Sequence, residues 1–220
     1  MRTMVVAPHP DDEALGCGGL LLRRKSEGSR LAWVIATRMA NHSPSNQKEL
    51  STRSSEIGQV SKKFGFDEVY QLDFETTKLD STPMTVLVKE ISKLIDSFQP
   101  TEILIPHHGD VHSDHRVVSE ATLSSVKWFR SPSISRVLSY ETLSETNFNL
   151  VRANQFSPNF YVDISEFISE KIQIINLYRS EMGEHPFPRS STAVESLAKL
   201  RGSACGFQSA EAFELLYERV

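Results

Sequence analysis

The chain has 220 residues, enough for one substantial hydrophobic core, so we expect a single domain over residues 1–220. Its 24 basic and 28 acidic side chains give a net charge of −4, which argues against a surface for nucleic acid or an anionic membrane and favours a small-molecule partner. The two cysteines form no CxxC pair. The apolar stretch at the N-terminus is too short for the core of a signal peptide, and no apolar run approaches the roughly 18 residues of a membrane span. We therefore expect a cytoplasmic protein.

Short apolar runs rich in β-branched residues alternate with segments in which apolar residues recur every three or four positions. The expected strands are 4–8, 30–37, 68–74, 101–107 and 134–141, and the helices between them are 13–27, 48–64, 83–98 and 114–129. Further along, the pattern predicts a strand near 159–163 and helices at about 165–181, 191–202 and 209–219. This alternation predicts an α/β fold with a Rossmann-like, mostly parallel sheet covered by helices on both faces.

Two dense polar clusters follow two of these strands. The first, HPDDE, occupies residues 9–13 directly after the first strand, and the second, HHGDVHSDH, occupies residues 107–115 after the fourth. Ligands of open parallel sheets bind beyond the carboxyl ends of the strands, where the strand order reverses. The crossovers are expected to place the first and fourth strands side by side, so the two clusters are predicted to meet.

The residue types in these clusters are those of a metal-dependent hydrolase. A catalytic zinc site normally uses three nitrogen or oxygen ligands and keeps one position for water, and His9, Asp12 and His115 could supply the three. Zinc lowers the pKa of bound water from about 15.7 to about 7, and Asp11, which lies between two of the ligands, could then take the proton as general base.

His112 and Asp114 lie beside His115 and suggest a second role. His112 would face the substrate, and contact with Asp114 would favour its imidazolium form, which suits it to stabilise an oxyanion or to protonate a leaving amine.

Plainer interpretations compete with these roles. An Asp-Asp-Glu group can simply cap a helix and complement its dipole, and Glu13 is interpreted mainly in that way. Loop histidines are usually solvated, which is the expectation for His42, His107, His108 and His185. Capping does not explain why two such clusters follow two strands of one sheet, so the pair favours a site.

HPDDEALGCGG, followed roughly 100 residues later by HSDHR, resembles the PIG-L or LmbE-like family of zinc-dependent de-N-acetylases. RSSE at 53–56 and RGSACGFQSAEAF at 201–213 resemble further motifs of that family, so the resemblance extends over most of the chain. It implies removal of the acetyl group from an N-acetylated amino sugar, either an N-acetylglucosamine-type conjugate or a nucleotide sugar. It also implies one zinc per chain, although mixed nitrogen and oxygen ligands accept other divalent transition metals.

The family's site residues carry over to matching positions of this chain. The resemblance implies that zinc is bound by His9, Asp12 and His115, that the general base is Asp11, and that the tetrahedral intermediate is stabilised by His112, oriented by Asp114. Some relatives assemble into rings, so a homo-oligomer is possible.

The sequence defines the substrate contacts less closely than the metal ligands. Arg53 is expected beside the site, where it contacts substrate or supports a loop, or else pairs with Glu49 or Glu56 on a helix surface. The tract 181–190 would form another wall, with His185 and Arg189 as substrate contacts rather than residues of a simple surface loop. Loop 38–47 would border the pocket, and it departs from the family's glycine-rich, often acidic loop, which leaves the substrate open.

Three other functions compete with this one. Clusters of aspartate and histidine also build the two-metal sites of phosphoesterases acting on small sugars or nucleotides. The glycines at 16, 18 and 19 suggest a dinucleotide binder, but the fingerprint needs a third glycine where Leu21 stands. A non-catalytic binding protein would have no need to keep Asp11 beside a metal site.

Overall fold

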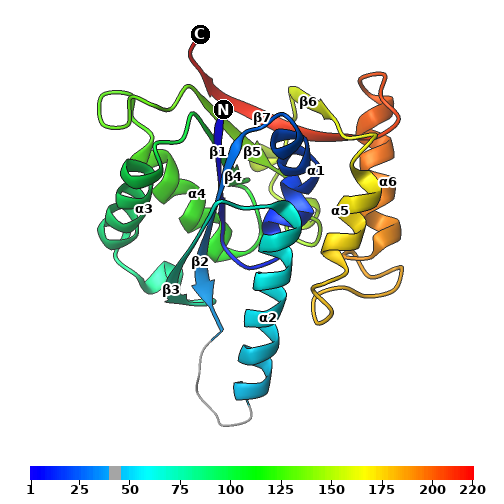
Figure 1. Cartoon of the computed structure of the whole chain (residues 1–220), viewed down its shortest axis with the longest axis horizontal. Helices are drawn as coiled ribbons and strands as arrows, with labels where there is room; N and C mark the ends of the chain where they lie inside the picture. Colours follow the sequence, from blue (N-terminus) through cyan, green and yellow to red (C-terminus); the bar gives the residue numbers. More distant parts are fainter. Residues whose placement is uncertain (40–45) are drawn as a thin grey trace.

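The computed structural model describes residues 1–39 and 46–220, so most of the expected loop 38–47, including His42, lies outside the described residues. Seven strands form one sheet in the order β3-β2-β1-β4-β5-β7-β6 (Figure 1). The strands are β1 (Arg2–Ala7), β2 (Arg30–Arg38), β3 (Glu68–Glu75), β4 (Glu102–Pro106), β5 (Arg136–Tyr140), β6 (Phe160–Asp163) and β7 (Ala210–Glu218). The α-helices are α1 (Asp12–Ser26), α2 (Asn46–Phe64), α3 (Met84–Phe98), α4 (Ser113–Ser125), α5 (Ile168–Ile175) and α6 (Ser191–Ser203).

The first five strands are parallel, and β1 pairs with both β2 and β4. The chain therefore moves outward from β1 to β2 and β3, then returns across β1 to continue through β4 and β5. This reversal puts the loop after β1 beside the loop after β4, which is the place where ligands bind in open α/β sheets. The expected juxtaposition of the first and fourth strands is confirmed, as is the mostly parallel α/β fold.

Alternate residues of the central strands enter two cores, one on each face of the sheet. Val5 and Ala7 pack with apolar residues of α1, α2, α5 and α6, whereas Met4 and Val6 pack with those of α3 and α4. Figure 1 shows the same two layers, with α3 and α4 on one side of the sheet and the other four helices on the opposite side. Helices on both faces were predicted. No helix in the described ranges is long and apolar enough to cross a bilayer.

The C-terminal part differs from the prediction in two places. Residues 209–219 were expected to be helical because they are rich in Ala, Glu and Leu, but 210–218 form β7, which pairs antiparallel with both β5 and β6. Pairing on both edges outweighs the local helix preference of these residues. The helix expected at 165–181 ends at Ile175, and turns over 176–182 bring Tyr178 and Glu181 toward the carboxyl ends of β1 and β4.

Helix α1 is broken near its start. Cys17 has non-helical backbone angles (φ −144°, ψ 21°), so residues 12–16 form a turn whose axis differs from that of the remainder. The backbone groups freed by the break are bound by two buried side chains. Lys171 Nζ donates to the Leu15 carbonyl oxygen at 2.8 Å, and the Glu211 carboxylate accepts from the Gly19 and Leu20 amides at 2.7 Å each. The first turn of α1 is thereby oriented independently of the rest of the helix.

Candidate active site

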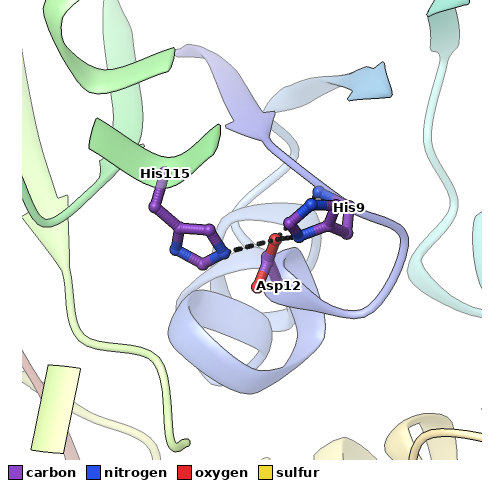
Figure 2. Close-up of side chains that lie close together, drawn as sticks. All are labelled: His9, Asp12 and His115. Atoms are coloured by element: carbon purple, nitrogen blue, oxygen red, sulfur yellow. Dashed lines mark hydrogen bonds and ion pairs between the residues drawn. The ribbon is translucent and has the colours of Figure 1, made fainter. Parts of the chain in front are cut away.

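The predicted metal ligands come together where β1 and β4 end. Figure 2 shows His9 and Asp12 at the turn into α1, facing His115 from the first turn of α4. One ligand atom from each lies within 4.8 Å of the others. Asp12 Oδ2 is central, 3.3 Å from His9 Nδ1 and 3.3 Å from His115 Nε2.

These distances fit a metal ion. In a tetrahedral site with bonds of about 2.0–2.1 Å, two ligand atoms stand about 3.3–3.4 Å apart. Metal-bound histidines also usually bond a carboxylate or carbonyl through their outer ring nitrogen. Here His9 Nε2 lies 3.1 Å from Asp114 Oδ2, and His115 Nδ1 lies 2.8 Å from Asp110 Oδ2. The donor types, their spacing and both outer partners therefore suit a divalent transition metal.

Asp110 is a residue of this site that sequence reasoning did not single out. It is 1% exposed, and its other carboxylate oxygen accepts from Thr146 Oγ1 at 2.6 Å. Its position in HHGDVHSDH, five residues before a histidine ligand, could have predicted this role, because carboxylates next to a metal site commonly orient the histidine ligands.

The charges of the triad are strongly coupled. Burial disfavours the cationic form of His9, but hydrogen bonds to Asp114 and Asp12 outweigh it and raise the pKa of His9 to about 9. Burial opposes charge on Asp12 and His115 as well, but their mutual attraction, with Asp110 on the far side of His115, lowers the pKa of Asp12 and raises that of His115. Without a metal, protons on the two imidazoles supply the positive charge that the three carboxylates, Asp12, Asp110 and Asp114, attract.

Asp11 lies beside the triad in an uncommon backbone conformation. Its φ is 134°, a region that residues with a side chain rarely adopt, and its amide donates to Glu13 Oε2 at 3.1 Å. The side chain is 4% exposed and lines the cavity. Burial and the neighbouring Asp12 carboxylate raise the pKa of Asp11 to about 7, with Arg189 and His9 acting in the opposite direction. A carboxyl group that titrates near neutral pH is suited to accept and return a proton.

Glu13 differs from the prediction that it mainly complements the dipole of α1. It does lie in the first turn, but it is fully buried, and Oε1 accepts from the Tyr178 hydroxyl at 2.7 Å while Oε2 accepts from the Asp11 amide. Burial raises the pKa of Glu13 to about 8. Its role in the structure is to hold the backbone of Asp11.

Asp114 and His112 are close together, but not through the contact expected from the sequence. Asp114 Oδ2 lies 3.1 Å from His9 Nε2 and 4.0 Å from His112 Nδ1, and the Asp114 carboxylate also accepts from the Thr77 and Leu79 amides. His112 Nδ1 instead accepts from the Asp114 amide at 3.1 Å, which makes His112 the N-cap of α4. Asp114 thus orients His9 rather than His112.

The protonation of His112 differs accordingly. Burial and the neighbouring His9 and His115 lower the pKa of His112, so the contacts do not favour the imidazolium that was expected. Because Nδ1 accepts a hydrogen bond, Nε2 carries the proton of the neutral ring. His112 lines the cavity beside the triad, where a neutral imidazole can still donate to an oxyanion.

The triad opens into a cavity of about 500 Å³. Of the three predicted substrate contacts, Arg53 and Arg189 line it, whereas the exposed His185 does not. Glu181 forms ion pairs with both arginines, at 3.3 Å for Arg189, and Arg53 also lies 3.4 Å from Glu56. Arg53 therefore pairs with Glu56, as one expectation had it, and also lines the cavity, as the other had it.

His107 differs from the expectation of a solvated loop histidine. It is fully buried, with Nδ1 3.1 Å from Glu214 Oε2 and Nε2 2.8 Å from the Asn154 carbonyl oxygen. His108 and His185 are exposed, as expected. Both ring nitrogens of His107 are occupied by protein groups, so this residue ties loops to β7.

The chain is similar to known deacetylases. The chain is 24% identical over 223 residues to a diacetylchitobiose deacetylase of Thermococcus kodakarensis, covering 96% of this chain and 81% of the relative. It is 25% identical over 189 residues to a probable N-acetyl-alpha-D-glucosaminyl L-malate deacetylase 2 of Bacillus cereus, covering 82% and 83%. Among solved structures, the conserved protein TT1542 of Thermus thermophilus superposes with a TM-score of 0.80 at 26% identity, covering 99% of this chain and 96% of that one.

The family model of the GlcNAc-PI de-N-acetylases, PIG-L, matches residues 4–126. This range contains both polar clusters, most of β1 and the whole of β4, the two strands that the clusters follow. The match spans more than half of the chain, and the chain therefore belongs to the PIG-L family of de-N-acetylases.

Proposed function

We propose that this protein is a zinc-dependent N-deacetylase that hydrolyses the acetamide of an N-acetylglucosamine-type sugar to a free amine and acetate. The observation that carries the proposal is the buried triad of His9, Asp12 and His115, with the Asp11 carboxylate beside it at one end of a cavity. Residues 1–220 are proposed to act as one deacetylase unit.

Each residue of the site is proposed to have a separate role in the reaction. When bound at the triad, zinc supplies a Lewis acid that polarises the amide carbonyl and lowers the pKa of water. Asp11 accepts the proton of the attacking water and returns it to the departing amine, a role supported by its carboxylate lining the cavity beside the triad. His112 donates from Nε2 to the oxyanion that forms on the carbonyl oxygen. Asp114 and Asp110 position the two histidine ligands.

The site does not favour the alternative of a phosphoesterase. Two-metal phosphoesterases hold their ions about 3.5–4 Å apart and need a separate ligand set for each. Among the residues that the structure describes, the group next to the triad consists of His9, His112 and Asp114, and it reuses His9. These side chains therefore provide a full ligand set for one ion.

The test is acetate release from a panel of N-acetylglucosamine derivatives by protein loaded with one equivalent of zinc. Asp11→Asn is expected to lower kcat by about 10²- to 10⁴-fold while zinc still binds, because the loss of the base leaves the three ligands in place. The matched control is Asp96→Asn on α3, which lies outside the cavity lining. A variant at position 11 with wild-type turnover, or a protein that binds no metal, would refute the proposal.

A further inference from the structure

The Asp11 carboxylate does not make the contact that is usual for an aspartate at the start of a helix. Asp11 is the N-cap of α1, a position where the side chain normally accepts a hydrogen bond from an amide of the first turn. Its side chain makes no capping hydrogen bond with that turn, which lies wholly within the described residues, and it lines the cavity instead. The backbone angles of Asp11, φ 134° and ψ −28°, also differ from the extended angles typical of an N-cap. The proposed base is thus separated from the helix that it begins.

Backbone angles of this kind persist only where neighbouring groups hold them. The Asp11 carbonyl oxygen accepts from the amides of Ala14 at 3.0 Å and Leu15 at 2.9 Å, as the N-cap carbonyl of any helix does. The Asp11 amide is held by a side chain, because it donates to Glu13 Oε2 at 3.1 Å. The bond from this amide to Glu13 is therefore the contact that distinguishes this helix start from an ordinary one.

Glu13 is itself held from a distant part of the chain. Its carboxyl group is fully buried, and Oε1 accepts from the hydroxyl of Tyr178, which is also fully buried, at 2.7 Å. Tyr178 belongs to the turns over 176–182, and the next amide in these turns, that of Arg179, donates to Glu56 Oε1 on α2 at 3.2 Å. A continuous series of hydrogen bonds thus connects the backbone of the proposed base to this segment and to α2.

We propose that Glu13 and Tyr178 are positioning residues of the deacetylation. Acting through the Asp11 amide, they hold the Asp11 carboxylate toward the cavity and away from the amides of the first turn. A carboxylate that capped α1 would be bonded to backbone amides and could not accept the proton of the attacking water. Neither Glu13 nor Tyr178 belongs to the described cavity lining, so neither is expected to touch substrate. The inference rests on the proposed deacetylase function and adds to it two residues that act through Asp11.

The main test is Tyr178→Phe, because it removes one oxygen atom and keeps the ring. In the zinc-loaded protein it should lower kcat for N-acetylglucosamine derivatives about tenfold, because small displacements of a catalytic group are costly. KM and zinc affinity should stay within about threefold of the wild type, because the cavity lining and the three ligands are unchanged.

Two substitutions of Glu13 separate the hydrogen bonds from the charge. Glu13→Ala removes the acceptor and should lower kcat by up to about 10²-fold. Glu13→Gln should recover most of that loss, because its amide oxygen can accept from the Asp11 amide while its NH₂ group donates to the Tyr178 oxygen. If Glu13→Ala does not fold, the tyrosine variants decide.

The matched control is Tyr140→Phe. Tyr140 is also fully buried, and its hydroxyl donates to the Val6 carbonyl oxygen at 3.0 Å. This variant should lose a similar amount of stability but keep the wild-type kcat. Wild-type kcat in Tyr178→Phe would overturn the proposal, as would equal losses of kcat in both tyrosine variants, a loss that lies in KM or in zinc affinity, or a Glu13→Gln variant as impaired as Glu13→Ala.

Failure of the proposed function gives a different result. If the wild-type protein releases acetate from no sugar, the deacetylase assignment is wrong, and crystal structures of the wild type and of Tyr178→Phe and Glu13→Ala then decide the positioning. An Asp11 carboxylate that turns to cap α1 in the variants would support it, and Asp11 with wild-type backbone angles in both variants would overturn it.

Discussion

Breaking the buried pair of Lys171 and Glu211 from one side should be among the most destabilising single changes in this chain. Both side chains are only 5% exposed, and their charged atoms are 2.7 Å apart. Glu211→Gln keeps the size and one acceptor oxygen but leaves the ammonium of Lys171 buried without a counter-ion. Breaking a buried pair in this way costs about 3–5 kcal/mol, which is a large part of the roughly 5–15 kcal/mol that stabilises a typical domain.

The double variant Lys171→Met, Glu211→Gln separates the charge from the hydrogen bonds. It removes the unpaired ammonium, so it should be more stable than Glu211→Gln alone by about 1–2 kcal/mol or more, even though the Leu15 carbonyl loses its donor. Urea unfolding of the chelator-treated proteins measures both free energies without a contribution from bound metal. A loss below about 1 kcal/mol for Glu211→Gln, or a double variant no more stable than the single one, would refute this reasoning.

Three further predictions concern the site and the first helix. Asp110→Asn should weaken zinc binding about 10- to 100-fold in a competition titration, because it removes the charge that orients a histidine ligand, and unchanged affinity would contradict that role. The pKa of His9 in the folded, metal-free protein is about 9, above its ordinary value of 6.5, so that protein should lose stability as pH rises from about 6.5 through 9. Metal binding at pH about 7.5 should then release at least one proton, measurable by calorimetry in two buffers; no release would contradict it. Gly16→Ala should lower the free energy of unfolding by about 1–3 kcal/mol, because its Cβ would lie 2.2 Å from the Tyr140 ring. Gly58→Ala, which has open space around it, should be neutral or stabilising. Thermal melts that rank the two variants the other way would refute the packing argument.

Much of the fold and of the site could be predicted from the sequence, for two physical reasons. Buried parallel strands have nearly continuous apolar runs, so β1, β2, β4 and β5 stood out from the helices between them. The positions of the polar clusters then followed from topology, because the strand order of such sheets reverses between β1 and its return neighbour β4. The meeting of His9, Asp12 and His115 required no knowledge of individual side-chain contacts.

The errors lie where tertiary contacts overrule local pattern. Residues 210–218 have the composition of a helix, and only the two neighbouring strands make them β7. Asp114 is next to His115 and two residues from His112, yet its carboxylate contacts His9, 105 residues away in the chain. Whether the carboxyl group of Glu13 meets solvent or the Tyr178 hydroxyl depends on a turn at 176–182 that no local pattern predicted.

The insertion of β7 between β5 and β6 has a consequence for the order of folding. The amide of Gly19, just after the break in α1, donates to a carboxylate 192 positions later in the chain, so the break gains its full set of hydrogen bonds only once residues 210–218 have entered the sheet. During synthesis, most of the chain must therefore leave the ribosome before the start of this first helix is fully supported. Contacts this distant in sequence slow folding, so a chain stalled before β7 would carry residues 9–13 on a helix whose break lacks its carboxylate partner.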